Sequence, residues 1–249
     1  MDELAFKTAI VTGGGSGIGR GIALALAGEG AQVVICGRRK SSLDETVQEI
    51  TQAGAEASGA EASGKIVAVQ ADVSVEADVN RLVKTTLDTF GTIDILVNNA
   101  GISGGATIHA HDIADWDRVM QVNLRGPFLL TRAALPTMRA QRSGHILNIS
   151  SESGLNYYPG DGAYGISKHA LNALGEYIQR ENQELNIRVD TICPGMVVTE
   201  MSENAPGLNQ AKCLYPKDIA DLAIWLLTRR PNIKIGTPIL IQTMQNPWE

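Results

Sequence analysis

A tyrosine and a lysine four residues apart are the most suggestive chemical pair in the sequence. Tyr164 and Lys168 would share one face of a helix, and a lysine charge beside a tyrosine favours the phenolate. A free tyrosine has a pKa of about 10, so this help would let Tyr164 exchange protons nearer neutrality. Ser151, thirteen residues earlier (164 − 151), is a neutral donor that could polarise an oxygen. The three residues predict proton transfer at an oxygen atom, although a surface pair and a serine capping a strand end are simpler interpretations.

A glycine-rich stretch near the N-terminus is the second candidate site. Residues 12–20 read Thr-Gly-Gly-Gly-Ser-Gly-Ile-Gly-Arg, between an apolar run at 9–11 and a helical pattern that includes Ile22 and Leu26. Glycines here allow a tight turn and a close approach of the backbone to a pyrophosphate, which the N–H groups of the new helix would face. A glycine-rich loop alone is weak evidence. Its position between a strand and a helix predicts a dinucleotide site.

The residues that follow the second apolar run distinguish between the two nicotinamide dinucleotides. NAD sites usually place an acidic residue about 20 residues past the glycines, where it binds the ribose hydroxyls. This chain has Gly37, Arg38 and Arg39 there. Guanidinium groups attract a 2′-phosphate and can bind it with two hydrogen bonds. We therefore expect NADP(H) to be favoured and NAD(H) to remain possible, unless both arginines are only solvated surface charges.

Apolar β-branched runs alternate with longer helical patterns along the whole chain. The expected strands are 9–11, 33–35, 66–69, 93–97, 145–149 and 187–192, with 238–241 as a candidate for a last strand. Short continuous runs of this kind are typical of a parallel sheet that is covered on both faces. No linker rich in proline, glycine or serine divides the chain. The sequence predicts an α/β fold, a doubly wound, Rossmann-like parallel sheet in a single domain over residues 1–249.

Composition excludes several other classes of protein. The net charge of −6 argues against nucleic acid, which requires a basic face. No apolar stretch reaches the ~20 residues of a membrane helix, and Met1-Asp2-Glu3 is unlike a signal peptide. Three scattered cysteines form neither a zinc ligand set nor a disulfide framework. We expect a cytoplasmic protein without a metal site, bound to neither membranes nor nucleic acid.

Motifs spread over nearly the whole chain resemble the short-chain dehydrogenase/reductase family in its common form of about this length. The matches are Thr-Gly-x-x-x-Gly-x-Gly at 12–19, Asp72-Val73 for the pair that touches the adenine, Asn-Asn-Ala-Gly at 98–101, Pro-Gly-x-x-x-Thr at 194–199, and Ser151, Tyr164 and Lys168 for the catalytic signature. Asn123 matches the fourth catalytic residue of that family. The chain departs from the family near its end, where the common Thr-Gly-Gln…Asp-Gly-Gly stretch is missing.

The resemblance implies hydride transfer between a nicotinamide ring and a carbonyl or secondary alcohol of a small molecule. Tyr164 would give or take the proton, Ser151 would polarise the carbonyl oxygen, Lys168 would favour the phenolate, and Asn123 would hold a water of a proton relay. The residues expected at the cofactor are Gly13, Ser16, Gly17, Ile18, Gly19, Arg38, Arg39, Asp72, Val73, Asn99, Ala100, Gly101, Tyr164, Lys168, Pro194, Gly195, Val197 and Thr199. The substrate stays open between 3-oxoacyl compounds and hydroxy acids or small aldehydes.

Two other classes of function share parts of this pattern. A cofactor-binding redox sensor that has lost turnover would be expected to lack Tyr164 or Lys168, and both are present. An epimerase or dehydratase of the extended relatives would carry a longer C-terminal substrate domain, for which the chain has no room. An oxidoreductase is therefore the favoured interpretation.

Three further expectations concern segments outside these motifs. Residues 54–58 are repeated identically at 59–63, and we expect residues 54–64 to form a solvated loop extension because they have no apolar period. Residues 200–215 are expected to cover the substrate. The helix from Trp116 to Met138 and the helix from Tyr164 to about Glu184 are expected to pack against a second copy of the chain, as relatives do in dimers of dimers.

Overall fold

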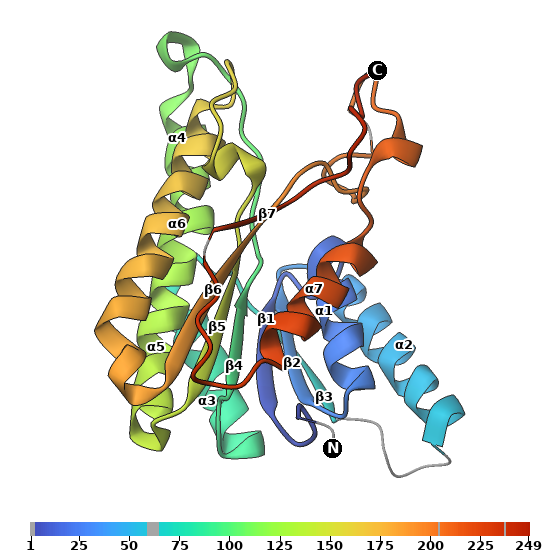
Figure 1. The fold of residues 1–249 in the computed structure, drawn as a ribbon, viewed down its shortest axis with the longest axis vertical. Coiled ribbons are helices and arrows are strands. Elements are labelled where there is room, and N and C mark those ends of the chain that lie inside the picture. The colour runs from blue at the N-terminus through green and yellow to red at the C-terminus, as the bar shows by residue number, and fades with distance from the viewer. Residues whose placement is uncertain (1–2, 59–64, 204, 237) are drawn as a thin grey trace.

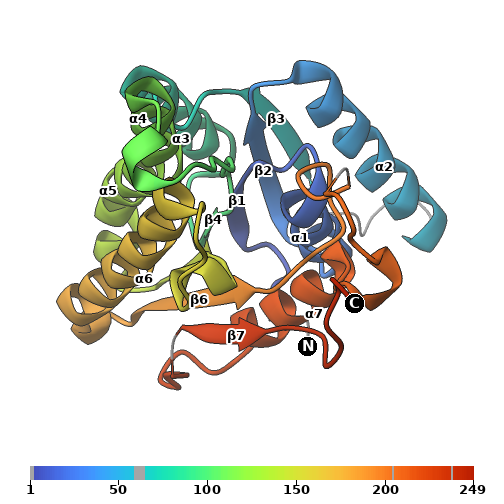
Figure 2. The same cartoon turned by 90° about the horizontal axis from the view of Figure 1, so that it is seen from above.

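The computed structural model describes residues 3–58, 65–203, 205–236 and 238–249. Seven parallel strands form one sheet in the order β3-β2-β1-β4-β5-β6-β7 (Figures 1 and 2). The strands are β1 Thr8–Thr12, β2 Gln32–Gly37, β3 Ile66–Gln70, β4 Ile95–Asn98, β5 Gly144–Ile149, β6 Ile187–Pro194 and β7 Ile239–Ile241. Every strand expected from the apolar runs is present, and the doubly wound parallel sheet is confirmed.

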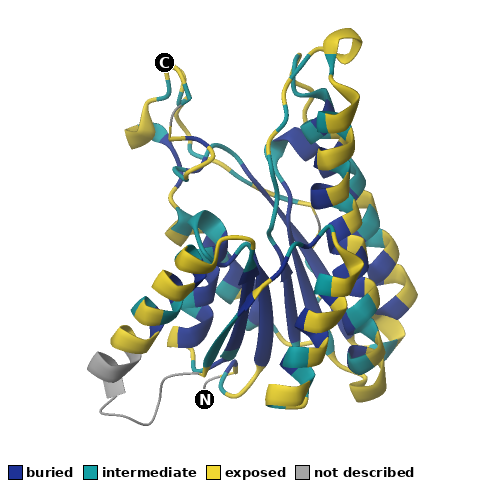
Figure 3. Ribbon diagram, turned by 180° about the vertical axis from the view of Figure 1, so that it is seen from behind, coloured by how far each residue is buried: buried dark blue, intermediate teal, exposed yellow. Residues whose placement is uncertain are grey.

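Helices cover both faces of this sheet. On one side lie α1 Gly17–Gly28, α2 Lys40–Ser58 and α7 Pro216–Leu227, and on the other lie α3 Glu76–Phe90, α5 Gly126–Gln141 and α6 Gly162–Asn182, with α4 Ile113–Met120 beside α6. Short 3₁₀ turns occupy Ile108–Ala110, Glu152–Gly154, Gln183–Leu185 and Gln210–Lys212. Because successive strand residues point to opposite faces, Ala9 and Val11 join the core under α1 and α7, whereas Ile10 joins the core under α3 and α5. The central strands are buried on both faces (Figure 3).

The helix expected from Trp116 to Met138 is interrupted. It begins at Ile113 as α4, widens into a π-helical turn at Gln121–Arg125, and continues as α5. Asn123 lies in this turn, and its amide exchanges two hydrogen bonds of 2.9 Å with the backbone N–H and carbonyl of Ile102. These hydrogen bonds join the widened turn to the loop after β4. π-Helical turns often occur at functional sites.

The first copy of the tandem repeat is helical, and so differs from the loop that its composition suggests. Helix α2 continues to Ser58 and so includes the first copy of the repeat at residues 54–58. Its alanines and glutamates are good helix formers, which explains why the helix extends there. The second copy, at 59–63, and residue 64 lie outside the described residues.

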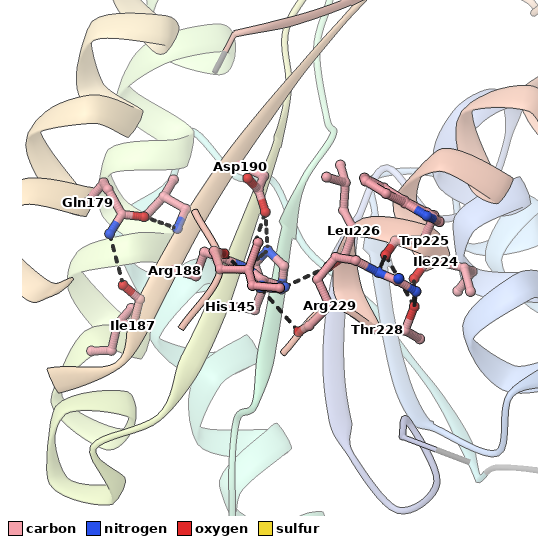
Figure 4. A network of polar contacts seen from close by, with 12 residues as sticks. His145, Gln179, Ile187, Arg188, Asp190, Ile224, Trp225, Leu226, Thr228 and Arg229 are labelled. Carbon is pink, nitrogen blue, oxygen red and sulfur yellow. Dashed lines mark hydrogen bonds and ion pairs between the residues drawn. The ribbon is translucent and has the colours of Figure 1, made fainter. Parts of the chain in front are cut away.

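A buried polar network joins β5, β6 and the end of α7 (Figure 4). Asp190, which is fully buried, accepts a hydrogen bond of 2.7 Å from Nε2 of His145 and lies 3.3 Å from Nε of Arg188. The Arg188 guanidinium also donates to the carbonyls of Leu226, Arg229, Arg230 and Ile233. Burial and the neighbouring guanidinium lower the pKa of His145, so its ring is neutral. Because Nδ1 faces the Arg188 guanidinium at 3.0 Å and Nε2 faces the Asp190 carboxylate, the ring proton is on Nε2. Arg188 thus serves as the cap for the C-terminus of α7.

The C-terminal tail packs on the segment that precedes α7. The N–H of Asn209 donates to the carbonyl of Pro247 at 2.8 Å, and the Thr243 hydroxyl donates to the carbonyl of Lys212 at 2.7 Å. Figure 1 shows the two segments side by side above the start of α7. Among the described residues, no helix is both long and apolar enough to cross a membrane.

Candidate active site

The glycine-rich turn connects β1 to α1 at the carboxyl edge of the sheet. Gly13 and Gly17 have positive φ angles of 66° and 52°, which residues other than glycine rarely adopt. A Cβ at Gly19 would lie 2.4 Å from the carbonyl oxygen of Gly13, and a Cβ at Gly13 would lie 2.8 Å from the Asn99 amide nitrogen. The turn therefore has no room for a side chain at Gly13 or Gly19 and exposes its backbone to the cleft, as a pyrophosphate requires.

The end of β4 holds this turn in place. The Thr12 hydroxyl accepts hydrogen bonds of 2.9 Å from the N–H groups of both Asn99 and Ala100, and donates to the carbonyl of Val97 at 3.1 Å. The Asn99 amide donates to the carbonyl of Thr12 at 2.8 Å. The Thr12 side chain at the end of β1 thereby fixes the first two residues after the neighbouring strand β4.

A cleft of about 560 Å³ lies above these turns and brings most of the predicted residues together. The predicted residues that line it are Gly13, Ser16, Gly17, Ile18, Arg38, Arg39, Asp72, Val73, Asn99, Ala100, Gly101, Tyr164, Lys168 and Thr199. The predicted residues that are not part of its lining are Gly19, Asn123, Ser151, Pro194, Gly195 and Val197. Gly19 is packed against Gly13, as described above. Val197 is buried and forms an isolated β-bridge with Leu214.

Tyr164 and Lys168 lie together at the inner end of the cleft, near the start of α6. The Lys168 ammonium is 5.5 Å from the centre of the Tyr164 ring and donates to the carbonyl of Ile149 at 3.0 Å. Ser151 hydrogen-bonds Tyr164 and accepts a hydrogen bond from the N–H of Ser153. The lysine is held by the end of β5, so its charge stays beside the phenol.

Burial sets the protonation states of this pair. It raises the pKa of Tyr164 to about 12 and lowers the pKa of Lys168 to about 8, because both charged forms lose water. At neutral pH the tyrosine is therefore a phenol and the lysine a cation. The carboxylates of Asp161 and Glu152 also raise the pKa of Tyr164. Asp161 precedes Tyr164 by three residues at the N-terminus of α6, and Glu152 directly follows Ser151, but neither acid belongs to the motifs that marked the site.

Asn123 reaches the same region from the π-turn. Besides its two bonds to Ile102, its amide donates to the Ser167 hydroxyl at 3.1 Å, next to Lys168 in α6. A Cβ at Gly101 would lie 3.4 Å from the Asn123 side-chain oxygen and 3.5 Å from the lysine nitrogen. Asn123 therefore links the loop after β4 to α6 and sits near Lys168 without lining the cleft.

The two arginines line the same cleft, together with several residues that the motifs did not mark. Arg39 forms an ion pair of 2.6 Å with Glu200, and Ser103, Glu200 and Met201 join the lining. Each of these three follows a predicted residue directly in sequence or within two positions. Ser103 was signalled only by its proximity to Gly101, whereas Glu200 and Met201 lie at the start of the segment 200–215 that was expected to cover the substrate.

The comparisons with known proteins agree with this geometry. The family model described as short chain dehydrogenase matches residues 7–207. An uncharacterized oxidoreductase of Staphylococcus epidermidis is 34% identical over 236 residues, which cover 95% of this chain and 97% of the relative. The chain belongs to the short-chain dehydrogenase/reductase family and is an oxidoreductase.

Solved structures of the same family superpose closely on this fold. An alcohol dehydrogenase from the archaeon Thermococcus sibiricus, complexed with 5-hydroxy-NADP, has a TM-score of 0.86 at 27% identity and covers 97% of this chain and 99% of its own. A metagenomic short-chain oxidoreductase in complex with NADP has a TM-score of 0.82 at 32% identity, with 98% and 100% covered. A levodione reductase has a TM-score of 0.85 at 28% identity, with 96% of each chain covered.

Proposed function

We propose that the protein transfers a hydride between NADP(H) and the carbonyl or secondary alcohol carbon of a small molecule. The observation that carries the proposal is the position of Tyr164, bonded to Ser151 and beside Lys168, in the same cleft as the glycine turn. Two of the similar structures are complexes with NADP or a derivative of it, which supports the choice of cofactor.

In this mechanism the nicotinamide supplies or accepts the hydride when it is bound. The Tyr164 hydroxyl gives a proton to the alkoxide oxygen that forms in reduction, and the Tyr164 phenolate takes the proton from the alcohol in oxidation. Ser151 donates a hydrogen bond to the same oxygen and stabilises its developing charge. Lys168 keeps a positive charge beside the phenol, and Asn123 holds α6 against the loop after β4 and would hold a water of the proton relay.

Replacing Tyr164 with Phe tests the catalytic assignment. The change removes only the hydroxyl, so we expect the fold and NADPH affinity to be retained and nearly all turnover to be lost. Turnover would be followed by nicotinamide absorbance and affinity by NADPH fluorescence. Steady-state rates within a fewfold of the unmodified protein would refute the role of Tyr164.

The preference for NADP(H) over NAD(H) rests on the end of β2. Arg38 and Arg39 line the cleft beside Gly37, where a carboxylate would oppose a 2′-phosphate. A Cβ at Gly37 would meet only Leu43, at an ordinary 3.5 Å, so an aspartate fits there. We expect Gly37→Asp combined with Arg38→Ser to reverse the preference. Equal affinities of the unmodified protein for both cofactors, measured by titration, would contradict it.

The substrate class is proposed more broadly, as a 3-oxoacyl compound or a hydroxy acid or small aldehyde. Similar structures include an alcohol dehydrogenase and a levodione reductase, which agrees with a carbonyl or alcohol substrate. Incubation with NADPH and a panel of these carbonyls would identify it. Tight NADPH binding without turnover on any of them would favour a redox sensor instead.

We also propose a homo-oligomer, a dimer of dimers, in the cytoplasm. Large apolar side chains remain exposed on the helices expected to pair, with Phe128 on α5 at 48% and Tyr177 on α6 at 68% exposure. Such residues are typical of an interface. The three cysteines are buried and unpaired, which is consistent with a reducing compartment.

A further inference from the structure

Arg39 and Glu200 form an ion pair across the outer end of the cofactor cleft. The Arg39 guanidinium lies 2.6 Å from the Glu200 carboxylate and 3.5 Å from the Ser16 hydroxyl in the glycine turn. The two charged residues are 161 positions apart in the chain. All three line the cleft, so the pair lies where the proposed cofactor would bind and not on an unrelated surface.

The Glu200 carboxylate is carried by a tightly built turn. The Ser202 hydroxyl is buried, accepts from the N–H of Thr199 at 3.0 Å and donates to the carbonyl of Val197 at 2.6 Å. On its other side the turn packs against the glycine-rich loop, since a Cβ at Gly17 would lie 3.1 Å from the Thr199 methyl group. The backbone that bears Glu200 is thus fixed relative to the phosphate-binding turn.

The two arginines that favour a 2′-phosphate are therefore not equivalent. Within the described residues, the Arg38 guanidinium has neither a hydrogen-bond partner nor an ion pair, whereas Arg39 is already paired with a carboxylate. Both members of the Arg39–Glu200 pair are more than half exposed, and exposed pairs of this kind are weak. A phosphate dianion can take Arg39 from Glu200, but the carboxylate then stays near it and repels it.

We propose that Glu200 is a cofactor-specificity residue that weakens the binding of 2′-phosphorylated nucleotides by competing for Arg39. The proposal rests on the proposed use of NADP(H). Arg38 then attracts the 2′-phosphate, while Glu200 partly cancels the attraction of Arg39. The preference for NADP(H) over NAD(H) is therefore smaller than two unpaired arginines would give.

The test uses the adenosine halves of the two cofactors, so that binding is measured without turnover. Affinities for 2′,5′-ADP and 5′-ADP would be determined by calorimetry for the unmodified protein and for Glu200→Gln. We expect the substitution to strengthen 2′,5′-ADP binding about two- to fivefold, the range that exposed ion pairs represent, and to leave 5′-ADP binding unchanged. Asp44→Asn is the matched control, because Asp44 is an exposed carboxylate that pairs with Lys40 near Arg39 and lies outside the cleft lining.

A double-mutant cycle with Arg39→Ala identifies the route of the effect. In the Arg39→Ala background, Glu200→Gln should no longer favour 2′,5′-ADP to the same extent. An equal change for both nucleotides, no change, the same gain in Asp44→Asn, or a gain that is fully retained without Arg39 would each overturn the proposal. If the unmodified protein binds both nucleotides equally but Glu200→Gln gains 2′-phosphate affinity, the NADP(H) preference fails and the role of Glu200 stands.

Discussion

Replacing Lys168 with Met should change both the rate and the pH dependence of alcohol oxidation. Methionine has a similar length but no charge, so the change removes the cation that lies 5.5 Å from the Tyr164 ring. If the distance to the ring centre is taken as the separation of the two charges, they interact by about 3 kcal/mol when the effective dielectric constant is about 20. That energy corresponds to about 2 units in the pKa of Tyr164. Below pH 8, where Lys168 is charged, the phenolate fraction and kcat/KM for oxidation should fall about a hundredfold.

The shape of the profile follows from the pKa values of the pair. The active state for oxidation is a phenolate beside a charged lysine. Below the Lys168 pKa of about 8, this state becomes more populated as the pH rises, because the pair must lose one proton to reach it. Above that pH the main state, a phenol beside a neutral lysine, has the same number of protons, so the active fraction stops rising. The unmodified protein should therefore reach a plateau with an apparent pKa no higher than about 8.

The Lys168→Met profile should lack this plateau and keep rising, because the Tyr164 pKa of about 12 is then the only one that matters. The assay is initial-rate oxidation of a secondary alcohol with NADP⁺ over the pH range in which the fold is stable. Tyr164→Phe serves as the control for oxidation that does not involve the phenol. A Lys168→Met protein that keeps the same plateau near pH 8, or loses less than about fivefold in rate, would refute the electrostatic role of Lys168.

Three other perturbations have defined outcomes. Arg188→Met leaves the buried Asp190 carboxylate without its guanidinium partner, and should lower the free energy of unfolding by about 3–5 kcal/mol; urea denaturation showing less than 1 kcal/mol would contradict this. Glu152→Gln removes a carboxylate that raises the pKa of Tyr164, so oxidation at neutral pH should become faster, and a slower or unchanged rate would oppose the assignment. Tyr177→Glu should dissociate the proposed oligomer, which light scattering would show as a mass falling to the 26.5 kDa of one chain; a protein that is already monomeric before the substitution would exclude the interface.

The strands and the glycine turn could be predicted because their signals are local. Each central strand is a short run of apolar residues that is buried on both faces, and the glycines of the turn occupy positions that have no room for a Cβ. The lining of the cleft by Tyr164 and Lys168 also followed from the motif, since their spacing places both on one helix. These features depend on neighbours in sequence or on one repeated supersecondary unit.

The features that could not be predicted depend on contacts between distant segments. The π-turn at Asn123 is stabilised by bonds to Ile102 and Ser167, and a helical pattern alone does not reveal it. The pairing of Arg39 with Glu200 joins the end of β2 to the turn after β6, and no spacing rule connects the two. The helical first copy of the repeat shows that the lack of an apolar period does not exclude a helix that extends from a stable one.

The proposed active site and the Arg188 network lie at opposite edges of the sheet. Because all strands are parallel, the residues that follow β1, β4, β5 and β6 meet at the carboxyl edge, which is where ligands bind in open α/β sheets. Arg188 lies near the opposite edge, one residue after β6 begins at Ile187. In the part of the chain that the structure describes, none of its hydrogen-bond or ion-pair partners lines the cleft. The loss of Arg188 should therefore lower the unfolding free energy while the folded fraction keeps its kcat. The kcat of the Arg188 variant would be measured under conditions in which the variant is fully folded. A lower kcat than that of the unmodified protein would show that the two edges are coupled.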